Sequence, residues 1–520
     1  MTIGPMKLAC KYCLFQMPAA LVSLVLLADG LAAHVPLRAE HCEIRVSRNV
    51  QVSDAAAMGR RYFKEPVIIV NPRDATNVIV GGWTTQENGS IGEMKIFSSN
   101  DRGGSWREGL WNLNPGSEPM SELPADFPSP QLQASAVDTG AAFDANGIAY
   151  FNSGGGTVVS SRDGGVRWER VPSAVLDPPL DIVTWGADIT DGPYRGHAYM
   201  AGMAHWQPGQ RSAGMPEDWF PEGTQIRLVT LANGTRRHNV NVANSAQIGV
   251  LSRHGSPSVN NSAPILVSST GAVIVPFFQY SNVVQGGARF VETTFWLARS
   301  DDGGETVGLP YEMRLASGEP LISRRYASHW IDMAVDPRGG NRQGHLYAVW
   351  LERESIDGDW QLRFSRSTDE GRSWLVPMLL DPALRDVADV MSSGSYGGGS
   401  SALRPTLPVV QVNRNGVIVV SWYKFSPGPI DRGRQTINYR RMFVASFDGG
   451  HHFTPEQALT ATETLDYRPE GRGNPNGDLG HFLRIVSDSS GAFHTAWLDG
   501  RTGRQEIWYA RLEPLCRQAR

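Results

Sequence analysis

Short stretches in which apolar and polar residues alternate recur along most of this chain. Gln225–Leu231 reads Gln-Ile-Arg-Leu-Val-Thr-Leu, and Met94–Phe97 and Gln361–Phe364 are similar runs. Alternation with a period of two, over about four to eight residues, is typical of a β-strand with one buried face. The pattern predicts an all-β fold of many short strands, with turns rich in Gly and Asp between them.

Five turn sequences follow one pattern, Ser-x-Asp-x-Gly-x-x-aromatic. They are Ser99–Trp106, Ser161–Trp168, Ser300–Val307, Ser367–Trp374 and Ser446–Phe453. Only Val307 departs from the aromatic residue at the last position. An Asp side chain can accept hydrogen bonds from nearby backbone N–H groups, and Gly can take the positive φ that a tight turn needs. The same turn at wide, regular spacing predicts a repeated sheet.

This pattern resembles the Asp-box repeat of the sialidase superfamily and related β-propellers. The resemblance covers most of the chain after about residue 60. It implies blades of four antiparallel strands, with the box between the third and fourth strands and on the face opposite the active site. It therefore implies a structural role for the five box aspartates, which are Asp101, Asp163, Asp302, Asp369 and Asp448.

The spacing of the boxes predicts the number of blades. The interval between Asp163 and Asp302 is about twice the others, so it holds a blade without a box, with strands at Gly196–Gly202 and Gln225–Leu231. A further blade fits after Asp448. We therefore expect seven blades, with six, the usual sialidase number, as the alternative. The seven units begin near Glu65, Ala134, Asp181, Pro257, Ser328, Arg404 and Gly477.

The last unit shows three strands, which leaves an open sheet edge. Ile44–Val50 is a spare strand ahead of the first blade and could fill that edge. Cys42 then lies just before the spare strand and Cys516 just after the last strand. If those two strands pair antiparallel, the two thiols come within reach of a disulfide. The alternative is two free thiols near the termini.

Residues 1–33 carry Lys7 and Lys11 and then the apolar run Met17–Ala28, a pattern typical of a secretory signal peptide. An uncleaved anchor is the alternative. Residues 34–520 are expected to form one propeller domain, with no stable membrane span after cleavage. Export agrees with an oxidised cysteine pair, so we expect a secreted or periplasmic protein.

Charge and composition exclude some classes of partner. The formal net charge is −4 and no long basic run is present, so nucleic acid is not an expected partner. No His-x-x-x-His, cysteine cluster, EF-hand or phosphate loop stands out, so no metal or other cofactor is predicted. A monomer is expected.

Arginines gather in the long loops that should build the face opposite the boxes. The planar guanidinium matches carboxylates, so convergent arginines predict an acidic carbohydrate as the ligand. For Arg501, a tight turn with an Asp499 contact is the alternative. The candidate substrate-binding residues are Arg324, Arg325, Arg404, Arg468 and Arg501.

The type of catalysis stays open. Sialidases use an Arg-Ile-Pro motif in the first blade, whereas this chain has Glu65–Pro72 there and no Arg-Ile-Pro anywhere. A polysaccharide lyase instead needs a Tyr or His base beside cations. The candidate catalytic residues are Tyr326, His329, Tyr467 and His481. The predicted function is a sialidase-like glycosidase or a uronate-polysaccharide lyase, and the alternative is a non-catalytic propeller that binds a glycan or a protein.

Overall fold

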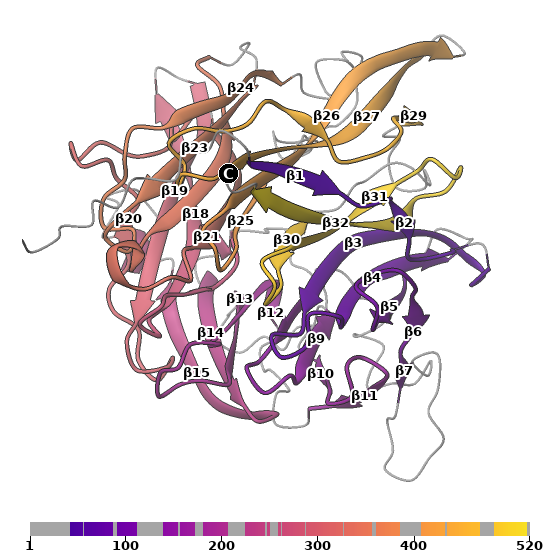
Figure 1. Cartoon of the computed structure of the whole chain (residues 1–520). Helices are drawn as coiled ribbons and strands as arrows, with labels where there is room; N and C mark the ends of the chain where they lie inside the picture. The colour runs from indigo at the N-terminus through magenta and orange to yellow at the C-terminus, as the bar shows by residue number, and fades with distance from the viewer. Residues whose placement is uncertain are drawn as a thin grey trace, which may run out of the picture. The chain divides into compact units, whose positions relative to one another are not determined.

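The computed structural model describes most of the unit that spans His41–Arg520. The described residues are 42–516 except 56, 87–90, 112–138, 154–156, 172–179, 206–223, 245–246, 250–257, 262, 286–287, 326, 356–359, 385–406, 432–433 and 468–482. They form seven antiparallel sheets (Figure 1). The predicted leader lies outside the described residues and stays a prediction.

Each sheet is a blade of four principal strands, which follow one another in chain order in blades 1 to 6. In blade 7 the fourth strand comes from the N-terminal end of the described chain. The first strands are β3 (Arg60–Val70), β8 (Gly140–Phe143), β12 (Leu180–Ala187), β16 (Ser258–Asn261), β21 (Ala327–Val335), β25 (Val409–Val412) and β30 (Arg484–Ser487). The second strands are β4 (Val78–Gln86), β9 (Ala149–Ser153), β13 (His197–His205), β18 (Val273–Gln285), β22 (Leu346–Glu352), β26 (Ile418–Asp431) and β31 (Phe493–Asp499). The third strands are β5 (Ile91–Ser99), β10 (Thr157–Ser161), β14 (Thr224–Ala232), β19 (Ala288–Ser300), β23 (Trp360–Ser367), β27 (Arg434–Ser446) and β32 (Glu506–Cys516).

The outer strands are shorter and less regular. The fourth strands are β6 (Arg107–Glu108), β11 (Arg167–Arg170), β15 (Thr235–Asn244), β20 (Tyr311–Glu312), β24 (Met378–Leu384), β28 (Gln457–Ala458) and, in blade 7, β1 (Cys42–Val46). The remaining elements are β2 (Val50–Gln51), β7 (Leu110–Trp111), β17 (Leu266–Val267), β29 (Thr464–Tyr467) and the 3-10 helix η2 (Gly340–Arg342).

The seven first strands close a ring. Each contacts the first strand of the next blade, β17 carries the contact from blade 4 to β21, and β30 returns to β3. The expected seven-bladed, all-β propeller is therefore confirmed, and the six-bladed alternative is excluded. All seven predicted unit starts fall within a first strand or shortly before one. The blade without a box is also confirmed, because a two-residue Asn233-Gly234 turn, both residues with positive φ, joins β14 to β15 instead.

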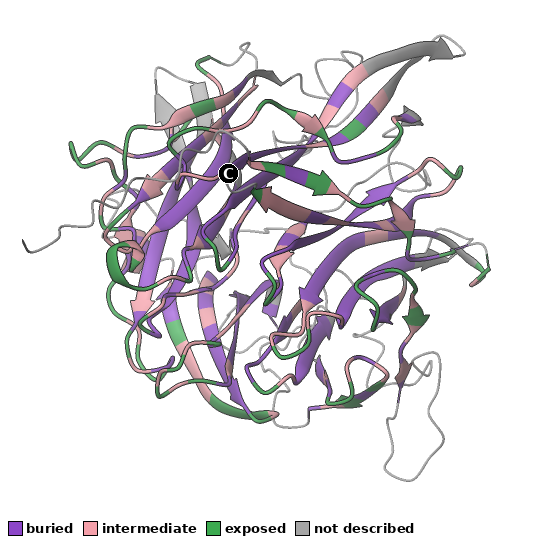
Figure 2. Cartoon of the chain, viewed as in Figure 1, coloured by how far each residue is buried: buried purple, intermediate pink, exposed green. Residues whose placement is uncertain are grey.

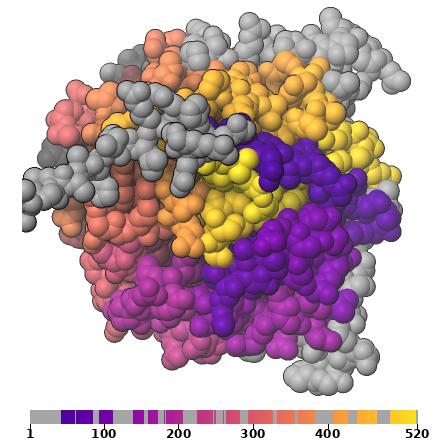
Figure 3. Space-filling view, in the orientation of Figure 1, coloured from indigo at the N-terminus to yellow at the C-terminus, as the bar shows by residue number. Residues whose placement is uncertain are grey.

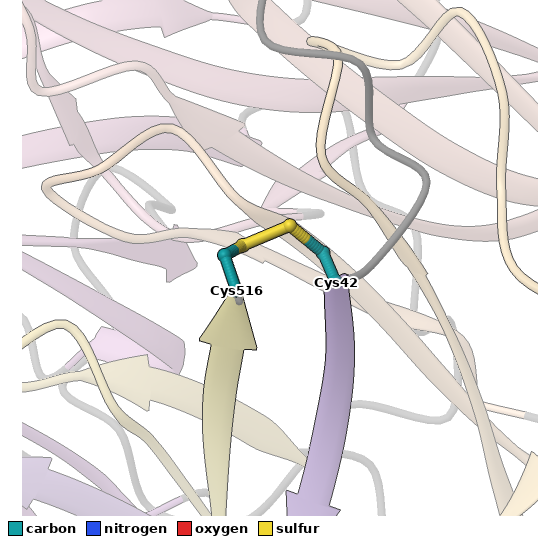
Figure 4. Close-up of a disulfide and its surroundings, with 2 residues drawn as sticks. All are labelled: Cys42 and Cys516. Atoms are coloured by element: carbon teal, nitrogen blue, oxygen red, sulfur yellow. A yellow bond between two sulfur atoms is a disulfide. The ribbon is translucent and has the colours of Figure 1, made fainter. Parts of the chain in front are cut away.

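The N-terminal strand closes the ring as expected. β1 pairs antiparallel with β32, and the two ends of the described chain lie side by side (Figures 1 and 3). Cys42 is the register partner of Cys516, and the two form a disulfide (Figure 4). The buried Glu506 carboxylate holds the following segment, since it accepts hydrogen bonds from Ser53 Oγ (2.6 Å) and the Ala55 N–H (2.9 Å). Blade 7 is thus held closed by the pairing of β1 with β32, by the hydrogen bonds to Glu506 and by the disulfide.

The apolar core lies between adjacent blades rather than in one central mass. The strands are mostly buried and the turns mostly exposed (Figure 2). Large side chains such as Trp168, Trp350 and Trp422 are fully buried, as expected where twisted sheets pack face to face. Within the described part of the chain, no helix is long and apolar enough to cross a membrane.

Candidate functional site

The five repeated turns identify the two ends of the ring. In each, the Ser hydroxyl donates to the Asp carboxylate at 2.7–2.9 Å and accepts the Gly N–H at 2.8–2.9 Å. The residue four positions after the Asp donates its N–H to the same carboxylate at 2.9–3.0 Å. These carboxylates therefore already have hydrogen-bond partners within their own turns. We call this end of the ring the turn end, and the opposite end the loop end.

Asp332 on β21 interacts electrostatically with Arg484 on β30 and with Arg441 on β27. These residues come from three blades, and we call them the axial cluster. Asp332 Oδ1 lies 3.7 Å from a guanidinium nitrogen of Arg484, although blade 6 separates their blades. Side chains from blades that are not neighbours can meet only on the side that faces the axis. Arg484 begins β30, which places the cluster toward the loop end.

Arg484 is a guanidinium with spare hydrogen-bonding capacity. Its side chain is 17% exposed, and its 3.7 Å contact with Asp332 is too long for a hydrogen bond. Within the described residues, its side chain makes no hydrogen bond. Burial lowers the pKa of Arg484, and the nearby Asp332 opposes that shift. Its 17% exposure leaves the guanidinium in contact with solvent, and its donors have no protein acceptor among the described residues, so the position favours an anionic ligand.

Arg441 is in a similar state and is fully buried. Its guanidinium lies over the Tyr423 ring, 4.8 Å from the centroid, and one nitrogen donates to the Leu407 carbonyl at 3.4 Å. Within the part of the chain that the structure describes, its Nε and second terminal nitrogen have no hydrogen-bond partner. Burial lowers the pKa of Arg441 to about 10, which Tyr423 and Asp332 partly offset. Arg441 therefore adds a buried positive charge that acts on Asp332.

Asp332 is the acid of the cluster. Its Oδ2 accepts the Val410 N–H at 2.7 Å. Among the described side chains, it pairs with Arg484 over the longer distance of 3.7 Å. Burial raises the pKa of Asp332 to about 6, and attraction to Arg484 and Arg441 holds it from rising further. A carboxyl group with a pKa near neutrality can both give and take a proton at physiological pH.

Other loop-end carboxylates are already satisfied by side chains. In three blades the indole N–H of a second-strand Trp donates to an acid on the first or second strand. The pairs are Trp83–Glu65 (2.8 Å), Trp350–Glu352 (3.1 Å) and Trp497–Asp499 (3.2 Å). Glu352 also pairs with Arg363 at 3.1 Å. The recurrence of this arrangement favours a structural role for these acids.

Three of the predicted substrate-binding arginines already have carboxylate partners. The pairs are Arg324–Glu312, Arg325–Glu292 (3.0 Å) and Arg501–Asp499. Arg501 also lies over the Trp508 ring, 4.4 Å from its centroid. A substrate acid at any of these positions would compete with a neighbouring side chain for the guanidinium.

The other candidates are only partly described. His329 lies on β21 and Tyr467 on β29, where the structure describes the backbone alone. Four candidates lie outside the described residues, and they are Tyr326, Arg404, Arg468 and His481. In sequence, His329 is three residues before Asp332, and His481 is three residues before Arg484.

The sequence interpretation did not select the axial cluster. Asp332 interrupts the apolar run Ile331–Val335, and Arg484 interrupts Phe482–Val486. A charged residue within a first strand is the one local signal that could have identified them, because such strands are mostly apolar. Arg441 lies beside Arg440, and the sequence does not tell which of the two faces solvent.

No family model matches the chain, and no curated protein matches it in sequence. Solved structures similar to it include an α-L-arabinanase from Penicillium chrysogenum with arabinobiose (14% identical, 90% of this chain and 98% of that chain, TM-score 0.40). A sialidase from Streptococcus pneumoniae is 11% identical (89% and 70%, TM-score 0.39). A polysaccharide lyase described as an ulvan lyase is 11% identical (89% and 95%, TM-score 0.45). Likenesses this distant carry no conclusion about the activity of this chain.

Proposed function

We propose that the protein acts on acidic glycans and binds the acid group of the substrate at the axial cluster. The observation that carries the proposal is Arg484, a partly buried guanidinium whose side chain makes no hydrogen bond among the described residues. Arg441 adds a buried positive charge that acts on the same carboxylate, Asp332. Positive charge in surroundings of low dielectric constant favours a carboxylate over a neutral sugar.

Asp332 would be the proton-transfer group of this site. Its raised pKa suits a general acid or base near neutral pH. The residues predicted from the loops remain proposals around this centre. Proton transfer is proposed for Tyr326, His329, Tyr467 and His481, and substrate contact for Arg324, Arg325, Arg404, Arg468 and Arg501. Either a glycosidase or a lyase can be built from these groups.

Membership of the sialidase superfamily and export are part of the same proposal. Support for the first is the Ser-x-Asp-x-Gly pattern, whose hydrogen bonds recur in all five turns. Support for the second is the Cys42–Cys516 disulfide, since such bonds persist in oxidising compartments. The predicted signal peptide agrees with export.

A non-catalytic glycan-binding propeller is the second candidate. Tyr423, the aromatic residue that contacts Arg441, donates its hydroxyl to the Leu498 carbonyl and accepts the Leu498 N–H, both at 3.1 Å. Burial raises its pKa far above neutrality. Tyr423 is therefore unsuited to act as a base. If no loop residue supplies a base, the site would bind a glycan without turning it over.

The test is a turnover screen with sialosides and uronate polysaccharides, measuring released sialic acid, new reducing ends and unsaturated-uronate absorbance. We expect activity on an acidic polymer and a loss of about 100-fold or more in Arg484→Met, as for other electrostatic groups in active sites. Arg414→Met is the matched control, because Arg414 is exposed and links blades 6 and 7 at the turn end by donating to the Ser489 carbonyl. Turnover of neutral glycans alone, or equal loss in both variants, would contradict the proposal.

A further inference from the structure

Asp332 and an acidic substrate would compete for Arg484. In the free protein, Arg484 faces the Asp332 carboxylate at 3.7 Å and its side chain makes no hydrogen bond among the described residues, while the buried Arg441 adds a second positive charge that acts on Asp332. A substrate carboxylate that binds Arg484 therefore comes close to Asp332 in poorly solvated surroundings. Two carboxylates that share one site rarely both stay ionised.

We propose that the substrate carboxylate replaces Asp332 as the partner of Arg484, and that Asp332 takes up one proton from solvent in the same step. The inference rests on the proposed function and specifies how its binding step is controlled. The substrate carboxylate stays ionised, and no bond within the substrate breaks at this stage. The proton adds to a carboxylate oxygen of Asp332, which then holds it ready to donate.

Among the described residues, the surroundings of Asp332 leave few groups that could absorb the added negative charge. On β22, its register partner is the apolar Val349. The neighbouring β17 consists of Leu266 and Val267, and β25 contributes a backbone N–H from Val410. Within this described part, the charged groups that act on Asp332 are Arg441 and Arg484, of which the substrate would take over Arg484.

The direction of the proton movement follows from this arrangement. Without a ligand, burial holds the pKa of Asp332 at about 6, so the group is mostly ionised at pH 7.5. A second carboxylate nearby and the diversion of Arg484 both disfavour the ionised form of Asp332, so its pKa rises on binding. Binding at pH 7.5 must then consume a proton, and higher pH must weaken it. The acidic substrate would thereby convert Asp332 into its acid form only when it is bound.

The experiment is isothermal titration calorimetry at pH 7.5 in phosphate and in Tris, whose ionisation enthalpies differ. The probes are a galacturonic acid trimer and N-acetylneuraminic acid. We expect uptake of about one proton per ligand and an affinity that falls about tenfold per pH unit between pH 7 and 8. Asp332→Asn should bind without proton uptake and with a flat pH profile. Asp191→Asn, a fully exposed acid at the turn end, should behave like the natural protein.

Failure of this inference and failure of the proposed function give different results. Binding of an acidic probe with the same enthalpy in both buffers and no pH dependence would overturn this inference and leave the proposed function standing. Absence of binding by both acidic probes, from a folded protein, would overturn the proposed function and this inference with it. Proton uptake that persists in Asp332→Asn would assign the proton to another group. The buffer comparison on the natural protein decides the matter even if Asp332→Asn does not fold.

Discussion

Replacing Asp332 by Asn should change how stability depends on pH. Asn has the shape of a protonated Asp, so the variant keeps a neutral side chain at all pH values. In the natural protein, burial raises the pKa of Asp332 from 3.8 to about 6. Folding therefore favours the protonated form, and its contribution to stability is fully present below pH 3.8 and is lost as pH rises through 6.

The size of the effect follows from the shift. A change of one pKa unit corresponds to about 1.4 kcal/mol, so the shift of Asp332 corresponds to about 3 kcal/mol. The free energy of unfolding of the natural protein, relative to Asp332→Asn, should fall by about this amount between pH 3.8 and 7. Asp332→Asn should therefore gain stability relative to the natural protein as the pH rises from 3.8 to 7.

Urea denaturation at several pH values measures this difference. Many other acids titrate in the same window, and comparison with the variant removes them. Asp369→Asn is the opposing control, because hydrogen bonds from Ser373 and Ser367 outweigh burial and lower the pKa of Asp369. The stability that ionised Asp369 contributes should be lost as pH falls below 3.8. A difference between natural protein and Asp332→Asn that does not vary with pH would refute the reasoning about the axial cluster.

Three further predictions concern the frame that holds the site. Asp369→Ala removes the acceptor for the Ser373 N–H (2.9 Å) and should cost about 1–3 kcal/mol by urea denaturation, whereas an unchanged midpoint would show that the turn is dispensable. Replacing both Cys42 and Cys516 by Ser, which opens a sequence separation of 474 residues, should cost about 4 kcal/mol or more, and equal thermal midpoints would contradict this. Glu506→Ala leaves the Ala55 N–H buried without its acceptor and should speed amide hydrogen exchange in residues 50–55, with unchanged exchange as the contrary result.

The fold could be predicted because its signals are local and repeated. Each Ser-x-Asp-x-Gly turn satisfies itself within a few residues, and alternation within a strand needs no knowledge of its neighbours. The closure by Ile44–Val50 could be inferred because an unpaired edge demands a partner and the cysteines flank the two strands. These are properties of short segments and of chain ends.

The site could not be predicted in the same way. Asp332, Arg441 and Arg484 come from three blades, and the closed ring alone brings them together. Conversely, Arg325 has the sequence character of a free surface arginine, and its partner Glu292 lies in the preceding blade. Sequence shows which residues carry charge, but partnership between blades depends on strand register and twist, which residue type does not determine.

The most direct test of the central claim is a crystal structure of the protein with a bound acidic oligosaccharide. The account predicts a ligand carboxylate within hydrogen-bond distance of Arg484, with Asp332 displaced from Arg484. A ligand whose acid group lies at another position on the ring, with the contact between Asp332 and Arg484 unchanged at 3.7 Å, would contradict it.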